Sequence, residues 1–418
     1  VKDHDGEPLS VEELVEAVCG RMQAEAAGMA KTEGAETAGA KDGVQETCED
    51  AQETGVTENT QEKPAVEPKK YTSKAAVKKF NQCYDRMEDF LNTDKKYKEQ
   101  DYSMNAYVGK DGLEKSFESY LHGTDGIRLT TVTSNGEVVD EHYAVEPKAG
   151  NNVELTIDID LQAVAEKALE SCILDLRENG VGKDGEGKDA EGGAAVVMSV
   201  KTAEVLASAS YPTFNLATYT EDFNKLNADE TAPLYNRALS AIYPPGSIYK
   251  MVTAIAAIDS GTASRYLQIE DQGIYRYYDD YQPACYIYTA SGVTHGVVDM
   301  MQAISVSCNY YFYEVGRRTG IDAIDQTAKQ LGLGEDTGVE IANADGYRAN
   351  PETKEKLYAN DPDQSGWYGA DTLMASIGQS ENKFTPLQMC VYTTALANKG
   401  TRYEAHFLKK IISGDYQT

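Results

Sequence analysis

The order of secondary-structure patterns in the C-terminal two thirds of the chain constrains the fold most strongly. A strand-like alternation at 153–157 precedes apolar residues at helical spacing over 161–176, and two apolar strands joined by a tight turn follow over 194–210. Helical patterns then dominate from Ser247 to Leu331. Strands joined by a tight turn pair antiparallel, and each amphipathic helix needs an apolar surface to cover. The pattern therefore predicts an α+β domain, with an antiparallel sheet covered by helices.

A low-complexity segment interrupts the N-terminal part. Residues 24–68 are mostly Ala, Glu, Gly and Thr with almost no large apolar side chain, which predicts a disordered acidic insertion. Residues 1–68 carry 17 acidic and five basic side chains, which is −12 of the total charge of −29. Around the insertion, the periodicity predicts helices at 9–23 and 71–91 and strands at 127–133 and 137–145.

Charge and cysteine usage exclude several classes of protein. The chain has 39 Lys and Arg against 68 Asp and Glu, so nucleic acid is not the expected partner. Its seven cysteines are widely spaced without a Cys-x-x-Cys pair, which argues against a zinc site or a disulfide scaffold. The histidines also lack metal-ligand spacing, and His295 is interpreted as a turn or packing residue. No cofactor or metal is predicted.

The sharpest chemical signal is Tyr243-Pro-Pro-Gly-Ser-Ile-Tyr-Lys250, followed by an apolar helical run to Gly261. Pro and Gly predict a helix that begins at Ser247, which places Ser247 and Lys250 on one face. A serine hydroxyl becomes a nucleophile when a neighbouring base takes its proton, and a lysine can be that base if burial holds it neutral. The alternative is an ordinary N-cap serine with an exposed lysine. The same spacing recurs at Ser380 to Lys383, in a polar turn, where it is interpreted as accidental.

A second element, Ser307-Cys308-Asn309, lies between two apolar runs. On a loop between helices, Ser307 and Asn309 can point into one cleft, where Ser307 could relay a proton and Asn309 could bind a substrate amide and orient Lys250. The alternative for Asn309 is a helix N-cap. Cys308 is interpreted as a buried structural thiol.

Together these segments resemble penicillin-binding proteins. Asn236-Arg237-Ala238 leading into the Ser247 segment is similar to the active-site serine motif of that family. Gly112–Gly123 resembles the non-catalytic pedestal of class B enzymes. The resemblance covers about residues 105–412, and further matches follow in order at Leu155-Thr-Ile-Asp158, Ala194-Ala-Val-Val197, Ser210-Tyr-Pro-Thr-Phe214, His295-Gly296, Gly378-Gln379 and Thr385-Pro386-Leu387-Gln388.

The resemblance implies a domain organisation and a site. Residues 1–23 would begin the pedestal, or dimerisation, domain, 24–68 would be the insertion, 69–150 the rest of the pedestal, and 151–418 a C-terminally truncated transpeptidase domain. Ser247 would be the acylated nucleophile and supply one oxyanion donor through its backbone N–H, Lys250 would be its base, and Ser307 and Asn309 would form the second catalytic and substrate-binding element.

The implied activity is that of a peptidoglycan D,D-transpeptidase. It would act on stem peptides ending in D-Ala-D-Ala, and β-lactams would acylate the same serine. The implied partners are a SEDS-type glycan polymerase and other elongation or division proteins. The implied location is the extracytoplasmic face of the cell membrane, with the N-terminal membrane anchor missing from this chain.

One motif of the resembled family is missing. No Lys-Thr-Gly or Lys-Ser-Gly occurs, although the family carries it on a strand after the segment that corresponds to Leu396–Gly400. We expect a truncated chain that catalyses poorly, because this strand would supply the second oxyanion donor. A non-catalytic scaffold of the cell-wall machinery remains an alternative. A β-lactamase or β-lactam sensor ranks lower, because both lack the pedestal segment Gly112–Gly123.

Overall fold

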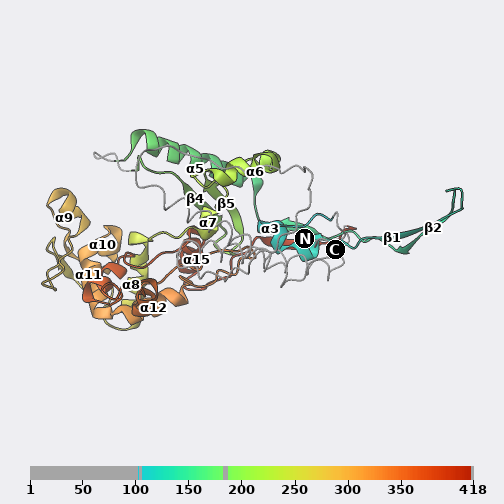
Figure 1. Cartoon of the computed structure of the whole chain (residues 1–418). Helices are drawn as coiled ribbons and strands as arrows, with labels where there is room; N and C mark the ends of the chain where they lie inside the picture. Colours follow the sequence, from blue (N-terminus) through green and yellow to red (C-terminus); the bar gives the residue numbers. More distant parts are fainter. Residues whose placement is uncertain (1–101, 103–105, 182–186, 416–418) are drawn as a thin grey trace, which may run out of the picture. The chain divides into compact units, whose positions relative to one another are not determined.

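Figure 1 shows the computed structural model of the chain, which describes residues 102, 106–181 and 187–415. The chain divides into two compact units, 1–106 and 107–418, and nearly all described residues belong to the second. The helices predicted at 9–23 and 71–91 and the acidic insertion lie outside the described residues. Within the described ranges, no helix is both long and apolar enough to cross a membrane.

The second unit starts with two short helices and a hairpin. Helix α3 (Gly112–Ser116) is capped by the carboxylate of Asp111, and α4 (Glu118–Leu121) follows it. Strands β1 (Ile127–Val132) and β2 (Val138–Val145) pair antiparallel, which confirms the two strands predicted in this region. Both strands are exposed along their whole length, so this hairpin buries neither of its faces among the described residues.

The predicted strand, helix and hairpin of the larger region are all present. Strand β3 (Asn152–Leu155) pairs antiparallel with β8 (Leu408–Ile412), and β4 (Gly193–Met198) pairs antiparallel with β5 (Val205–Tyr211). Val205 N–H donates to the carbonyl of His406, next to β8, and this hydrogen bond joins the two ladders. Strand β5 alternates between buried and half-buried residues, whereas β4 is half-buried throughout.

Helices cover both faces of the β4–β5 hairpin (Figure 1). Helix α5 (Ile159–Asn179) lies on one side, and its first turn is capped by Asp158, whose carboxylate accepts hydrogen bonds from two backbone N–H groups. Helices α7 (Arg237–Ser240) and α15 (Pro386–Ala397) contact the hairpin from the other side. The predicted α+β architecture is confirmed.

The remaining elements form a helix-rich region, as predicted, with one additional short antiparallel ladder between β6 and β7. They are η1 (Leu216–Thr218), α6 (Tyr219–Ala228), η2 (Gly246–Tyr249), α8 (Lys250–Asp259), β6 (Ile269–Asp271), α9 (Tyr286–Ser291), β7 (Gly296–Val298), α10 (Met300–Ser305), α11 (Asn309–Thr319), α12 (Ile321–Gln330), α13 (Pro351–Leu357) and α14 (Gly369–Ala375).

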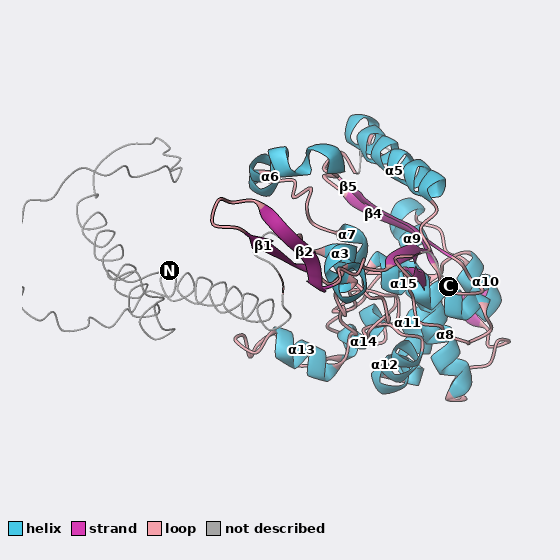
Figure 2. Ribbon diagram, turned by 90° about the vertical axis from the view of Figure 1, so that its right-hand side faces the viewer, coloured by secondary structure: helices cyan, strands magenta, loops and turns pink. Residues whose placement is uncertain are grey.

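Helix α8 contacts both α11 and α12, which lie close to it in Figure 2. Its buried residues Val252 and Ala256 pack in an apolar cluster with residues of α12, whereas Ala254 and Ala257 pack in a second cluster with residues of α11. The small alanine side chains allow both neighbouring helices to approach α8 closely. The start of α8 is therefore held from two sides, which fixes the position of the Ser247 segment.

The packing around α11 and α14 generates a stability prediction. Leu373 of α14 is fully buried in the cluster that contains Tyr311 and Phe312. We expect Leu373→Ala to lower the free energy of unfolding by roughly 2–5 kcal/mol, because the substitution leaves a cavity in a packed core. Urea titration of the variant measures the change. Leu357→Ala in α13 is the matched control, since Leu357 is 45% exposed. Equal losses in the two variants would contradict the assigned core.

Candidate active site

The Ser247 segment turns sharply before α8 begins. Gly246 has φ +59, which favours glycine, and its N–H donates to the carbonyl of Gly378 at 2.9 Å. A Cβ atom on Gly378 would lie 2.2 Å from the Gly246 carbonyl oxygen, so this approach requires two glycines. Ser247 is exposed in the 3-10 turn η2, and α8 begins at Lys250. The sequence predicted a helix that begins at Ser247; in the structure a 3-10 turn begins at Gly246 and the α-helix itself begins at Lys250.

Lys250 is buried at the start of α8, with only 2% of its surface exposed. Its Nζ donates to three oxygens: the Ser307 carbonyl at 2.8 Å, Ser307 Oγ at 2.9 Å and Asn309 Oδ1 at 2.6 Å. These three acceptors are neutral, and burial lowers the pKa of Lys250 from its ordinary value to about 8. A substantial fraction of Lys250 is therefore the neutral amine near pH 8, the form that can accept a proton.

Ser307 and Asn309 lie in the turn between α10 and α11. Asp299 and Gln302 form a capping box at the start of α10, and the turn itself places Ser307 at φ +53, a left-handed conformation that is uncommon outside glycine. In this conformation Ser307 Oγ donates to Ser247 Oγ at 2.9 Å while it accepts a hydrogen bond from Lys250 Nζ. The alternative of Asn309 as an N-cap does not apply, because Cys308 is the N-cap of α11.

The structure thus brings the four predicted site residues together. The sequence spacing suggested that Lys250 and Ser247 would be adjacent, and the structure places the Ser307 hydroxyl between them. The result is a hydrogen-bonded chain from Lys250 through Ser307 to Ser247. The recurring spacing at Ser380 and Lys383 builds no such chain, since Lys383 is exposed and its backbone pairs with Tyr347.

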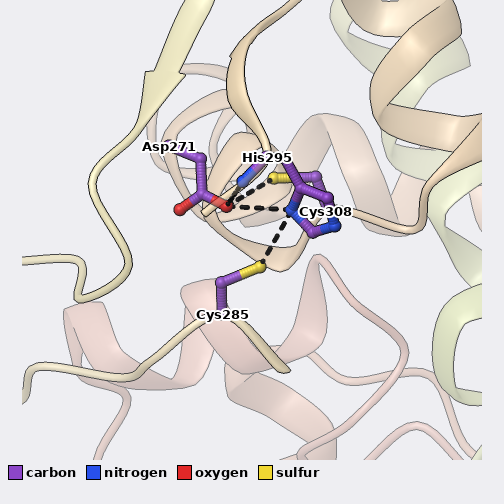
Figure 3. Close-up of side chains that lie close together, drawn as sticks. All are labelled: Asp271, Cys285, His295 and Cys308. Atoms are coloured by element: carbon purple, nitrogen blue, oxygen red, sulfur yellow. Dashed lines mark hydrogen bonds and ion pairs between the residues drawn. The ribbon is translucent and has the colours of Figure 1, made fainter. Parts of the chain in front are cut away.

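A second polar cluster includes Cys308, the residue after Ser307, together with Asp271, Cys285 and His295 (Figure 3). Asp271 Oδ2 accepts hydrogen bonds from His295 N at 3.1 Å and from Cys308 Sγ at 3.6 Å, and it lies 2.9 Å from His295 Nδ1. His295 Nδ1 also lies 3.5 Å from Cys285 Sγ. Asp271, Cys285 and Cys308 are buried, and the His295 side chain is 10% exposed.

The four side chains could hold a metal ion, because one ligand atom from each lies within 4.8 Å of all the others. Two thiols, an imidazole and a carboxylate are groups that bind zinc tetrahedrally. The sequence spacing predicted no zinc site and interpreted His295 as a turn or packing residue, and the structure brings His295 into this group of possible ligands. The cluster was missed because its members are 14, 10 and 13 residues apart, which matches no metal motif. The position of Cys308 between Ser307 and Asn309 was the available signal.

The cluster is also electrostatically unusual. Burial acts to raise the pKa of Asp271, but hydrogen bonds from the backbone N–H groups of His295 and Gly273 and from the His295 ring outweigh it and hold the pKa below its ordinary value. The pKa of Cys285 is lowered, chiefly by the adjacent Cys308 thiol and further by the backbone N–H groups of Tyr310 and Asn309. The buried carboxylate therefore stays ionised beside the two thiols.

Two protein-family models match the chain. The model described as penicillin binding protein transpeptidase domain matches residues 193–418, and the model described as penicillin-binding protein dimerisation domain matches residues 87–155. The first match covers more than half of the chain. The chain therefore belongs to the penicillin-binding protein transpeptidase family, in class B, as the sequence resemblance predicted.

Individual relatives agree with this assignment. Peptidoglycan D,D-transpeptidase MrdA of Acinetobacter baumannii is 31% identical over 314 residues, which are 74% of this chain and 43% of the relative. A chain of the structure described as "Structural coordination of polymerization and crosslinking by a peptidoglycan synthase complex" is 30% identical, with a TM-score of 0.64 over 77% of this chain and 54% of that one.

A third similar structure is the complex between penicillin-binding protein PBP2 and MreC from Helicobacter pylori. It is 28% identical to this chain, with a TM-score of 0.62, and the match covers 78% of this chain and 56% of that one. The chain thus spans about half the length of the relatives that it matches.

Proposed function

We propose that this chain carries the acylation machinery of a peptidoglycan D,D-transpeptidase. The observation that supports the proposal is the hydrogen-bonded chain from the buried amine of Lys250 through Ser307 to the exposed hydroxyl of Ser247. A nucleophile, a base with a lowered pKa and a connecting hydroxyl are the parts that serine acyl transfer needs. The curated name of the A. baumannii relative gives the same activity, peptidoglycan D,D-transpeptidase.

The proposed reaction has two steps on one serine. Ser247 Oγ attacks the carbonyl carbon of the penultimate D-Ala of a stem peptide, its proton leaves towards the Lys250 amine, and the terminal D-Ala departs with a proton. The amine of a second stem peptide then attacks the ester, forms the cross-link, and Ser247 regains its proton. A β-lactam would acylate the same oxygen, but its opened ring stays attached to the carbonyl and slows the second step.

Ser307 and Asn309 have distinct proposed roles in this reaction. When Lys250 is an ammonium, it donates to Ser307 Oγ and Ser307 donates to Ser247 Oγ, which is the observed pattern. When Lys250 is neutral, rotation of both hydroxyls reverses the chain, and the Ser247 proton can pass through Ser307 to the amine. Asn309 Oδ1 holds the Nζ in place at 2.6 Å, and the proposed role of its amide nitrogen is to donate to a substrate carbonyl.

The proposed partners and location follow from the relatives. The structural relatives include a peptidoglycan synthase complex and a complex with MreC, which supports a glycan polymerase of the SEDS type and other elongation or division proteins as partners. Because peptidoglycan is cross-linked outside the cytoplasmic membrane, we place the protein on the extracytoplasmic face. The assignment of residues 69–150 to a pedestal and of 151–418 to the transpeptidase domain is proposed on the same basis.

The role of Ser247 is tested by covalent labelling. We expect a fluorescent penicillin to label the protein, and Ser247→Ala to abolish the label because the acylated oxygen is removed. Gel fluorescence after denaturation measures it. The matched control is Ser305→Ala, an exposed serine on α10 that should label like the wild type. Label that persists in Ser247→Ala would contradict the assignment of Ser247 as the nucleophile. A wild-type protein that takes up no label would favour the alternative of a non-catalytic scaffold.

The role of Lys250 is tested by the pH dependence of labelling. Only the neutral amine accepts a proton, so the rate constant of acylation should rise by about tenfold per pH unit below about pH 8 and level off above it. Rapid-quench labelling across this range gives the profile, and circular dichroism at each pH verifies that the protein stays folded. A rate constant that is flat or falls as the pH rises would exclude Lys250 as the base.

Removal of the amine provides an independent test. We expect Lys250→Ala to reduce the acylation rate constant by a factor on the order of 10² to 10⁴, the usual contribution of a general base. Lys383→Ala is the matched control, because Lys383 occupies the same motif spacing but is exposed. The two rate constants are compared at one pH under pseudo-first-order conditions. An unchanged acylation rate constant in Lys250→Ala would show that Lys250 is not the base.

A further inference from the structure

The cluster behind the active site contains two thiols that face each other. Cys285 and Cys308 are both fully buried, and their sulfur atoms belong to the group whose ligand atoms all lie within 4.8 Å. Each thiol also lies next to a second polar group, His295 Nδ1 for Cys285 and Asp271 Oδ2 for Cys308. Figure 3 shows the two side chains converging from opposite sides of the cluster. The two sulfur atoms therefore lie within 4.8 Å of each other, the separation that a disulfide would have to close.

Cys308 connects this cluster to the predicted chemistry. It is the residue between Ser307 and Asn309, both of which bind Lys250 Nζ. Its sulfur accepts the N–H of Tyr311 at 3.5 Å and thereby caps α11. A displacement of the Cys308 side chain therefore removes the helix cap and pulls on the turn that places the Ser307 hydroxyl against Ser247.

We propose that Cys285 and Cys308 form a redox pair, which closes to a disulfide beside the active site and slows the acylation of Ser247. The oxidant is a small-molecule or protein disulfide. The Cys285 thiolate attacks one of its sulfurs and releases one thiol, and the Cys308 thiolate then displaces the second thiol from the mixed disulfide. In the balanced reaction, two protein thiols are oxidised, one disulfide is reduced, and the two protons end on the released thiols.

The geometry favours Cys285 as the first sulfur to react. Cys285 is the residue before α9, a short helix whose first residue, Tyr286, is 47% exposed. The Tyr286 hydroxyl donates to the Val306 carbonyl at 3.1 Å, and this hydrogen bond ties α9 to the end of α10. A local opening of α9 would expose Cys285 to the oxidant, because Cys285 directly precedes this short helix. Cys308, which caps α11, is then the resolving thiol.

Closure must shorten the separation of the sulfurs to the S–S bond length of about 2.0 Å. The Cys308 sulfur then leaves Tyr311 N and Asp271, and the Ser307 turn shifts with it. A displacement of about 1 Å in a catalytic group can cost on the order of 10² in rate, so the oxidised protein should be acylated more slowly by up to that factor. This consequence rests on the proposed function, whereas formation of the disulfide does not.

The sequence makes the cross-link easy to detect. Trypsin cleaves after Arg276 and Arg317, and the peptide 277–317 contains Cys285 and Cys308 and no other cysteine. The full-length protein is incubated with oxidised glutathione and with EDTA, which removes metal ions from the thiols. It is then alkylated and digested, and the peptide masses are measured by mass spectrometry. We expect a peptide that is two hydrogens lighter than the reduced form and takes up no alkyl group. Dithiothreitol should restore two alkylatable thiols.

Penicillin labelling of the same samples measures the consequence. Oxidation should lower the acylation rate constant of the wild type and of Cys172→Ser, an exposed cysteine outside the cluster. It should leave Cys285→Ser unchanged. Two alkyl groups on the oxidised wild-type peptide, or a disulfide that leaves the labelling rate unchanged, would overturn the proposal. If the disulfide forms but even the reduced protein fails to bind penicillin, the proposed function is contradicted, whereas the proposal that Cys285 and Cys308 form a disulfide is supported.

Discussion

The burial of the Lys250 amine is the interaction on which the site depends. A charged ammonium that is 2% exposed is costly unless hydrogen bonds replace its water, and here all three donors of Nζ have oxygen partners. Two of these oxygens come from Ser307 and one from Asn309, so the α10–α11 turn has to lie against the start of α8. The packing of α8 between α11 and α12 supplies this placement. The Lys250 side chain therefore couples the packing of the helical core to the geometry of the site.

The same coupling extends one layer behind the turn. Cys308 caps α11 and reaches Asp271, and Asp271 binds His295, which contacts Cys285. The carboxylate stays ionised because two backbone N–H groups and the imidazole bind it. The turn that carries Ser307 and Asn309 is thus held on one side by an amine and on the other by a thiol. Protonation of Lys250 and oxidation of Cys308 would therefore both change contacts of this one turn.

Local patterns predicted the fold and part of the site. The β4–β5 hairpin, α5 and, to within three residues, the start of α8 could be predicted because periodicity and the Pro-Pro-Gly turn are encoded within a few residues. The position of Ser307 between Lys250 and Ser247 could not, because it depends on φ +53 in a turn 57 residues beyond Lys250. The Asp271 cluster was missed for the same reason. Its four side chains are brought together only by tertiary packing, which cannot be inferred from their spacing along the sequence.

The placement of a serine, and not of the lysine itself, next to the nucleophile has a chemical consequence. A hydroxyl can donate and accept at once, so the Ser307 link works in both directions. With Lys250 neutral, the link can carry the proton of Ser247 inward, and with Lys250 protonated it can return a proton to a leaving amine or to the serine. A direct contact would tie the lysine to one atom. The intermediate hydroxyl allows one buried amine to serve both steps of a two-step transfer, provided the turn does not move between them.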